Sequence, residues 1–117
     1  MLLRVDPAST VPLFEQLAAS VRLDAARGAI SSGERLPAAR DVATSLDINV
    51  HTVLRAYQLL REEGLIDLRR GRGAVVTDRV ALYGALGEAI PALVNRARAL
   101  DVGLGALTAM IRQEYDS

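Results

Sequence analysis

The sequence predicts a mainly α-helical protein with one small β-hairpin. Three segments with apolar residues at helical spacing come first along the chain. Two short runs of strand-forming residues follow, joined by a loop that contains two glycines. Two helices joined by a turn of three or four residues and followed by a hairpin form the outline of a winged helix-turn-helix. We therefore predict a winged helix-turn-helix followed by two C-terminal helices.

The composition excludes several classes of protein and site. The chain has 117 residues, no cysteine and a single histidine, His51, which excludes a disulfide framework and a cysteine or histidine zinc site. No apolar stretch approaches the roughly 20 residues of a membrane span. Asp6 and Pro7 come before any apolar signal sequence could form, so we expect a cytoplasmic protein that does not bind membranes. No group of residues suits acid–base or nucleophilic catalysis, so we expect neither enzyme activity nor a cofactor.

The charged residues balance overall but are unevenly placed. Fourteen arginines face fourteen acidic residues, there is no lysine, and the net charge of zero provides no general attraction to nucleic acid. The segment Arg69-Arg70-Gly71-Arg72, however, holds three positive charges and no acid. From Arg79 onward the two signs are equal in number. An anionic partner is therefore expected to meet the middle of the chain.

The first two helices are predicted from their apolar spacing and end signals. The first ends at Gly28, with Thr10 as its N-cap and Pro12 in its first turn, where a missing N–H costs nothing. Residues 31–35 form a turn rich in serine and glycine. Leu36-Pro37 then opens a second, shorter helix.

A third helix and a hairpin follow. Asn49 is a suitable N-cap for this helix, which we expect over residues 49–63 with its end at Gly64. On a helical wheel one face carries Val50, Val53, Leu54, Tyr57 and Leu60. The other face carries His51, Thr52, Arg55 and Gln58. The strands are expected at Leu65–Leu68 and Ala74–Thr77.

The composition changes after Asp78, which predicts a DNA-binding domain over residues 1–77 and a helical dimerisation region over residues 78–117. The first helix of this region is expected to be kinked at Pro91. Apolar residues occupy more than one side of this helix, and the short C-terminal region cannot bury all of them by itself. We therefore expect a second copy of the chain to bury the rest. The residues predicted to form the dimer contact are Leu82, Leu86, Ile90, Leu93, Leu100, Leu104, Leu107 and Ile111.

The third helix and the hairpin suggest contacts with double-stranded DNA. Polar side chains in the first turn of a helix can reach base edges in the major groove, and arginines on a hairpin tip can contact the backbone. The candidate DNA-contacting residues are Arg40, Asn49, His51, Thr52, Arg55, Arg69, Arg70, Gly71, Arg72 and Gly73. Each alone has a simpler interpretation: Asn49 as an N-cap, His51 as a solvated residue, Arg55 as the partner of Glu62 or Asp47. The order in which they occur together favours DNA binding.

Residues 11–77 resemble a known family. Five ordered motifs carry the resemblance: Pro12-Leu13-Phe14-x-Gln16-Leu17, Gly33-Glu34-Arg35-Leu36-Pro37-Ala38-Ala39-Arg40, Asn49-Val50-His51-Thr52-Val53-Leu54-Arg55-Ala56-Tyr57, Glu63-Gly64-Leu65-Ile66 and Gly71-Arg72-Gly73-Ala74-Val75-Val76. Together they are similar to the GntR family of bacterial transcription regulators, and the short tail is similar to that of its YtrA subfamily. The resemblance implies a homodimeric repressor that binds an inverted-repeat operator and dimerises through two C-terminal helices. It places DNA contacts at Arg40, Asn49, His51, Thr52, Gly71 and Arg72.

Two residues depart from the family pattern. Ala38 stands where the family usually has a serine that caps the second helix, and Leu54 stands where many relatives have a polar or basic residue. Contacts with the DNA backbone are therefore expected to depend more on the hairpin arginines. Two alternatives remain open: a regulator gated by a small effector bound at the dimer tail, and a winged helix that binds protein instead of DNA.

Overall fold

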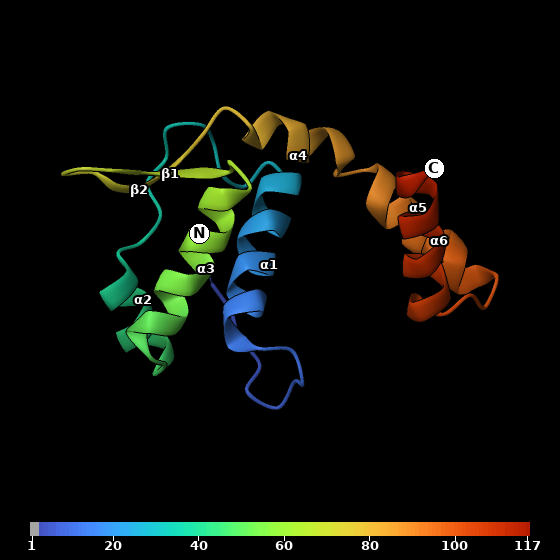
Figure 1. Cartoon of the computed structure of the whole chain (residues 1–117), viewed down its shortest axis with the longest axis horizontal. Helices are drawn as coiled ribbons and strands as arrows, with labels where there is room; N and C mark the ends of the chain where they lie inside the picture. Colours follow the sequence, from blue (N-terminus) through green and yellow to red (C-terminus); the bar gives the residue numbers. More distant parts are fainter. Residues whose placement is uncertain (1–2) are drawn as a thin grey trace. The chain divides into compact units, whose positions relative to one another are not determined.

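The computed structural model describes residues 3–117 and confirms the predicted winged helix-turn-helix with a helical tail (Figure 1). The chain divides into two compact units, the first ending at Ala85 and the second spanning Leu86–Ser117. The elements, in order, are α1 (Leu13–Ala26), α2 (Ala39–Leu46), α3 (Val50–Glu62), β1 (Ile66–Arg69), β2 (Gly73–Val76), α4 (Val80–Leu86), α5 (Ala89–Ala99) and α6 (Leu104–Asp116). The functional boundary between residues 77 and 78 stays a prediction.

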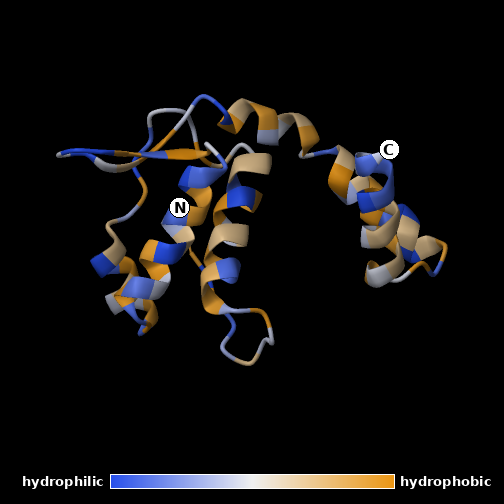
Figure 2. Ribbon diagram, in the orientation of Figure 1, coloured by the Kyte–Doolittle hydropathy of each residue, from blue (hydrophilic) through white to orange (hydrophobic). Residues whose placement is uncertain are grey.

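The core of the first unit lies between α3 and the two helices that pack on it, α1 and α2. Apolar residues three and four positions apart form a stripe on each helix, as Figure 2 shows by the alternation of hydrophobic and hydrophilic residues around α1 and α3. The largest side chains with almost no exposed surface are Leu17, Val21, Val53, Leu60, Leu65, Ile66, Val75 and Val76. Burial of this stripe orients α3, so the opposite face of α3 is left for contacts outside the chain.

Two predicted helix starts are wrong. The N-cap residue of α1 is Pro12, which makes no side-chain cap hydrogen bond, and Thr10 is exposed. The Gln16 side chain instead holds the preceding segment, because its Nε2 donates to the carbonyl oxygen of Val11 at 2.8 Å. The second helix begins at Ala39, since Leu36 is still extended and its N–H donates to the carbonyl oxygen of Ala74 in β2 at 2.9 Å.

The ends of α3 agree with the prediction, but one residue of its inner face does not. Asn49 caps the helix, its Oδ1 accepting from the N–H of His51 at 2.8 Å. Gly64 ends it with φ +80°, a left-handed conformation that suits glycine. Leu54 shares a face of the helical wheel with Val53 and Tyr57 but is 48% exposed, because the buried stripe runs through Val53, Ala56, Tyr57 and Leu60.

The hairpin is antiparallel and begins and ends within one residue of the predicted strands. Ile66 pairs with Val76 and Arg69 with Gly73. The segment before α2 adds to it, because Arg35 forms a bridge with Val75 that the sequence did not indicate. The hairpin is thereby tied to the start of α2.

The tail contains one more helix than predicted. The expected kink at Pro91 is wrong: the helical segment is interrupted at Gly87-Glu88 instead, and α5 begins at Ala89. Pro91 therefore lies in the first turn of α5, where its missing N–H removes no hydrogen bond. The final helix, α6, corresponds to the second predicted tail helix.

In the second unit Ala97 is buried, while large aliphatic side chains remain exposed on α5 and α6. Ile90 is 53% exposed. Of the predicted dimer residues, Leu107 is half-buried and the following are exposed: Leu82, Leu86, Ile90, Leu93, Leu100, Leu104 and Ile111. Among residues 3–117, every helix falls short of the length and hydrophobicity that a membrane crossing requires.

Candidate nucleic-acid interface

The first turn of α3 lies beside the first turn of α1 at the surface. Asn49, His51, Thr52 and Arg55 line a hollow of about 720 Å³ together with residues 12–15. His51 and Arg55 are exposed and Thr52 is half-buried. The structure thus brings four of the predicted DNA-contacting side chains together. The N-cap interpretation of Asn49 also holds, since its Oδ1 is used by the backbone of α3.

Arg55 is positioned by an aromatic ring that the sequence analysis did not single out. Its guanidinium carbon, Cζ, lies over the Phe14 ring, 3.8 Å from the ring centroid, a cation–π contact that holds the side chain in place. The suggested partner Glu62 instead accepts a hydrogen bond from Gln58 at 3.5 Å. A cation–π contact uses none of the five N–H donors of the guanidinium, and these donors suit a phosphate. Phe14 belongs to the first motif, but its partner lies 41 positions along the chain, so spacing could not reveal the pair.

Tyr57 fixes the start of α2, where Arg40 is located. The Tyr57 hydroxyl donates to the carbonyl oxygen of Pro37 at 2.6 Å. Burial raises the pKa of Tyr57 to about 12, so this hydroxyl stays protonated even in alkaline solution at pH 10. Ala38 supplies no side-chain cap, as expected from its departure from the family pattern. Arg40 is the second residue of α2 and is exposed.

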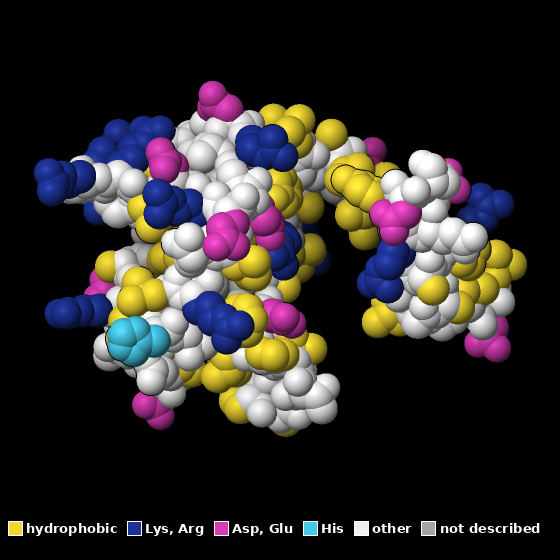
Figure 3. Space-filling model, viewed as in Figure 1, with side chains coloured by type: hydrophobic (Ala, Val, Ile, Leu, Met, Phe, Trp, Pro, Cys, Tyr) yellow, Lys and Arg dark blue, Asp and Glu magenta, His cyan; other side chains and the backbone are white. Residues whose placement is uncertain are grey.

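The hairpin loop carries exposed basic side chains, and Figure 3 shows arginines at its end. Gly71 and Gly73 have φ of +77° and +72°, so the tight turn requires glycine at both, as predicted. Arg69 forms an ion pair with Asp67 at 3.6 Å, which offsets part of its charge. Arg70 and Arg72 are exposed. Arg70 and Arg72 are therefore better candidates than Arg69 to contact an anionic partner.

The loop and the start of α2 are held by one extended segment. The N–H of Val76 donates to the carbonyl oxygen of Glu34 at 2.8 Å, and that of Gly33 donates to the carbonyl oxygen of Val76 at 2.8 Å. This segment then leads directly into α2. The hairpin and Arg40 therefore belong to one hydrogen-bonded framework within the first unit.

A second polar cluster joins three helices away from the first turn of α3. Arg22 of α1 donates from Nε to Glu63 Oε1 at 2.9 Å, and the hydroxyl of Tyr83 in α4 donates to Oε2 at 2.8 Å. Burial raises the pKa of Glu63, but the hydrogen bonds from Arg22 and Tyr83 and the positive charge of Arg22 outweigh it, so this pKa lies below its ordinary value. Burial and the bond to Glu63 raise the pKa of Tyr83. The cluster fixes the end of α3 relative to α1 and α4.

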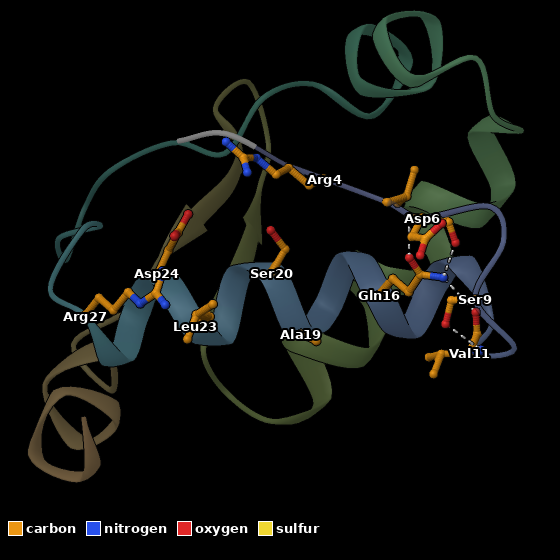
Figure 4. A pocket seen from close by; sticks show the side chains of 11 residues that line it. Arg4, Asp6, Ser9, Val11, Gln16, Ala19, Ser20, Leu23, Asp24 and Arg27 are labelled. Atoms are coloured by element: carbon orange, nitrogen blue, oxygen red, sulfur yellow. Dashed lines mark hydrogen bonds between the residues drawn. The ribbon is translucent and has the colours of Figure 1, made fainter. Parts of the chain in front are cut away.

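An open groove of about 850 Å³ lies on the outer side of α1 (Figure 4). Its polar centre is already internally bonded: Gln16 Oε1 accepts from the N–H of Asp6 at 2.6 Å, and Nε2 donates to the carbonyl oxygen of Asp6 at 3.1 Å. The groove is formed by residues 4–27, and none of its lining belongs to the tail where the effector alternative placed a ligand.

Comparison with known proteins decides the family. A family model described as bacterial regulatory proteins, gntR family, matches residues 13–76, more than half of the chain. The chain belongs to the GntR family. Membership places it among bacterial regulatory proteins, and the relatives named below are transcription regulators.

Individual GntR relatives agree with this result. The chain is 34% identical over 77 residues to the HTH-type transcriptional repressor YtrA of Bacillus subtilis (strain 168), covering 66% of this chain and 59% of that protein. It is 36% identical over 98 residues to the HTH-type transcriptional regulator Rv1152 of Mycobacterium tuberculosis, covering 84% of this chain and 81% of that one. A solved structure titled YtrA from Sulfolobus acidocaldarius, a GntR-family transcription factor, has a TM-score of 0.63 and 29% identity, covering 85% and 99% of the two chains.

Proposed function

We propose that this GntR-family protein is a cytoplasmic, homodimeric repressor that binds an inverted-repeat DNA operator and has no catalytic activity. The observation that carries the proposal is the exposed hollow at the start of α3, which gathers Asn49, His51, Thr52 and Arg55. A winged helix buries the opposite face of its third helix, so this end is free to enter a major groove about 12 Å wide.

The side chains divide by chemistry into base-reading and backbone-contacting groups. His51 and Thr52 carry donors and acceptors at the start of α3 and are assigned to base edges. Arg55, stacked on Phe14, is assigned to a phosphate. Arg40 and the hairpin loop at residues 69–73 are assigned to the backbone, because phosphate contacts fix the register of a protein on DNA.

Dimerisation is supported by the exposed aliphatic side chains of the tail. Leu86, Ile90 and Leu93 expose much of their surface to water within a unit that is too small to cover them. A second copy of the chain would bury the same surface on both protomers. Two protomers related by a two-fold axis would read half-sites about 10 bp apart, or a multiple of that distance.

The test of this function is selection of random duplex DNA by the purified protein at near-physiological salt. Enrichment of an inverted repeat is expected, and repression is then measured from a promoter that contains this repeat. Absence of enrichment with a folded dimer would contradict operator binding by the protein alone. Repeating the selection with cell extract, and measuring melting temperature with candidate effectors, would then separate a ligand-gated regulator from a protein-binding module.

The substitution Arg72→Ala tests the backbone role of the hairpin loop. We expect weaker binding to all DNA sequences alike, and a plot of log affinity against log salt that is flatter by about one unit, because one phosphate contact is lost. Binding is measured by fluorescence anisotropy at several salt concentrations. Arg27→Ala is the matched control. Arg27 is an exposed arginine at the C-terminal end of α1, away from the turn of α1 that lies beside α3, so this substitution should leave the slope unchanged. A changed base preference at one position would contradict the assignment.

A further inference from the structure

The outward face of α3 contains one large apolar residue among polar ones. His51, Leu54, Arg55 and Gln58 follow the spacing that places residues on one side of a helix, and all four are exposed. Leu54 is 48% exposed, although α3 buries its other aliphatic side chains wholly or in part. A leucine so placed is in contact with water in the free protein, and a complex that covers this face gains stability if an apolar group meets it.

The neighbours of Leu54 limit what that partner is. His51, Arg55 and Gln58 are hydrogen-bonding or cationic side chains, which suit DNA and do not suit an apolar protein surface. The major groove offers one conspicuous apolar group, the 5-methyl group of thymine. Apolar side chains are known to contact this methyl group and so distinguish thymine from cytosine.

The position of Leu54 along α3 also suits a contact with a base. It lies one turn after His51, which begins the face assigned to base edges, and one turn before Tyr57, whose hydroxyl is bonded to Pro37. The Tyr57 bond restrains rotation of α3 about its axis, so Leu54 cannot turn inward without breaking a buried contact. Its exposed position is therefore a fixed feature of the recognition face.

We propose that Leu54 contacts the 5-methyl group of a thymine in each operator half-site and thereby specifies that base. This inference rests on the proposed function, because it requires that α3 enter the major groove. It assigns to Leu54 a role in base selection in place of the phosphate or polar contact that a basic residue there would make.

The experiment uses the operator obtained by selection, with each thymine replaced in turn by deoxyuridine, which lacks only the methyl group. We expect one thymine in each half-site to matter. Replacing it in one half-site should lower the affinity of the wild-type protein about fourfold, the loss expected for one buried methyl group. Replacing it in both half-sites should lower the affinity about fifteenfold. The variant Leu54→Ala is expected to bind the thymine and deoxyuridine duplexes equally. At the same position, the wild type should prefer 5-methylcytosine to cytosine by a similar factor.

Leu23→Ala is the matched control, because Leu23 is 47% exposed but lies on the outer side of α1. This variant should keep the full response to deoxyuridine. The proposal is overturned if the wild type tolerates deoxyuridine at every position, or if Leu54→Ala responds to it as the wild type does. Failure of the wild type to bind any selected duplex would instead refute the proposed function. The melting temperature of each variant confirms that it is folded.

Discussion

The substitution Ile90→Asp is expected to convert the proposed dimer to a monomer and to lower affinity for the proposed operator of two half-sites by at least about a hundredfold. In a symmetric dimer the change occurs twice, and each carboxylate must lose its hydration at an apolar contact, which costs several kcal/mol per ion. In a dimer, binding of one half-site brings the second protomer close to the other half-site. A monomer lacks this linkage and loses a gain in affinity of about 10² to 10⁴-fold.

The position of Ile90 favours a folded variant. The residue is 53% exposed and lies in the first turn of α5, where a negative charge interacts favourably with the helix dipole. Sedimentation equilibrium measures the oligomeric state, and anisotropy compares duplexes with one and two half-sites. Asn95→Asp adds the same charge to α5 at an exposed polar position and should remain dimeric. Equal dimerisation of the two variants would show that Ile90 lies outside the contact.

The substitution Glu63→Gln is expected to lower the free energy of unfolding by about 1–2 kcal/mol at neutral pH. Glu63 accepts hydrogen bonds from Arg22 and Tyr83, and an amide can replace only one of these acceptor oxygens. Hydrogen bonds to charged groups contribute about 1.5–3 kcal/mol, and partial exposure of the pair to solvent reduces this value. Urea denaturation followed by circular dichroism measures the difference.

The same difference should depend on pH in a defined direction. The pKa of Glu63 is lower in the folded protein than its ordinary value of 4.5, so its contribution is complete above about pH 4.5 and is lost as the pH falls through the folded value. Wild type and Glu63→Gln should therefore converge in acid. Glu62→Gln is the control, because Glu62 is exposed and, among residues 3–117, accepts one long side-chain bond, from Gln58; the change should alter stability by less than about 0.5 kcal/mol. A constant gap between wild type and Glu63→Gln at all pH values would contradict the role of the ionised carboxylate.

Local signals in the sequence were enough for the winged helix-turn-helix outline. Asn49 and Gly64 mark the two ends of α3 because a cap and a left-handed residue act within a few positions of the chain. Gly71 and Gly73 marked the hairpin turn for the same reason. The ordered motifs over residues 11–77 also indicated the family, which the match to residues 13–76 confirms.

Features decided by residues far apart in the sequence required the tertiary structure. The helical wheel groups Leu54 with Val53 and Tyr57, but the packing of α3 on α1 and α2 buries those two residues and leaves Leu54 exposed. The stacking of Arg55 on Phe14 and the bridge of Arg35 to Val75 each join segments about 40 residues apart. The sequence alone determined the order of helices and hairpin in the winged helix-turn-helix, because caps, turns and periodicity act locally. Only the tertiary structure decided which side chains those elements leave exposed, because burial depends on how the elements pack together.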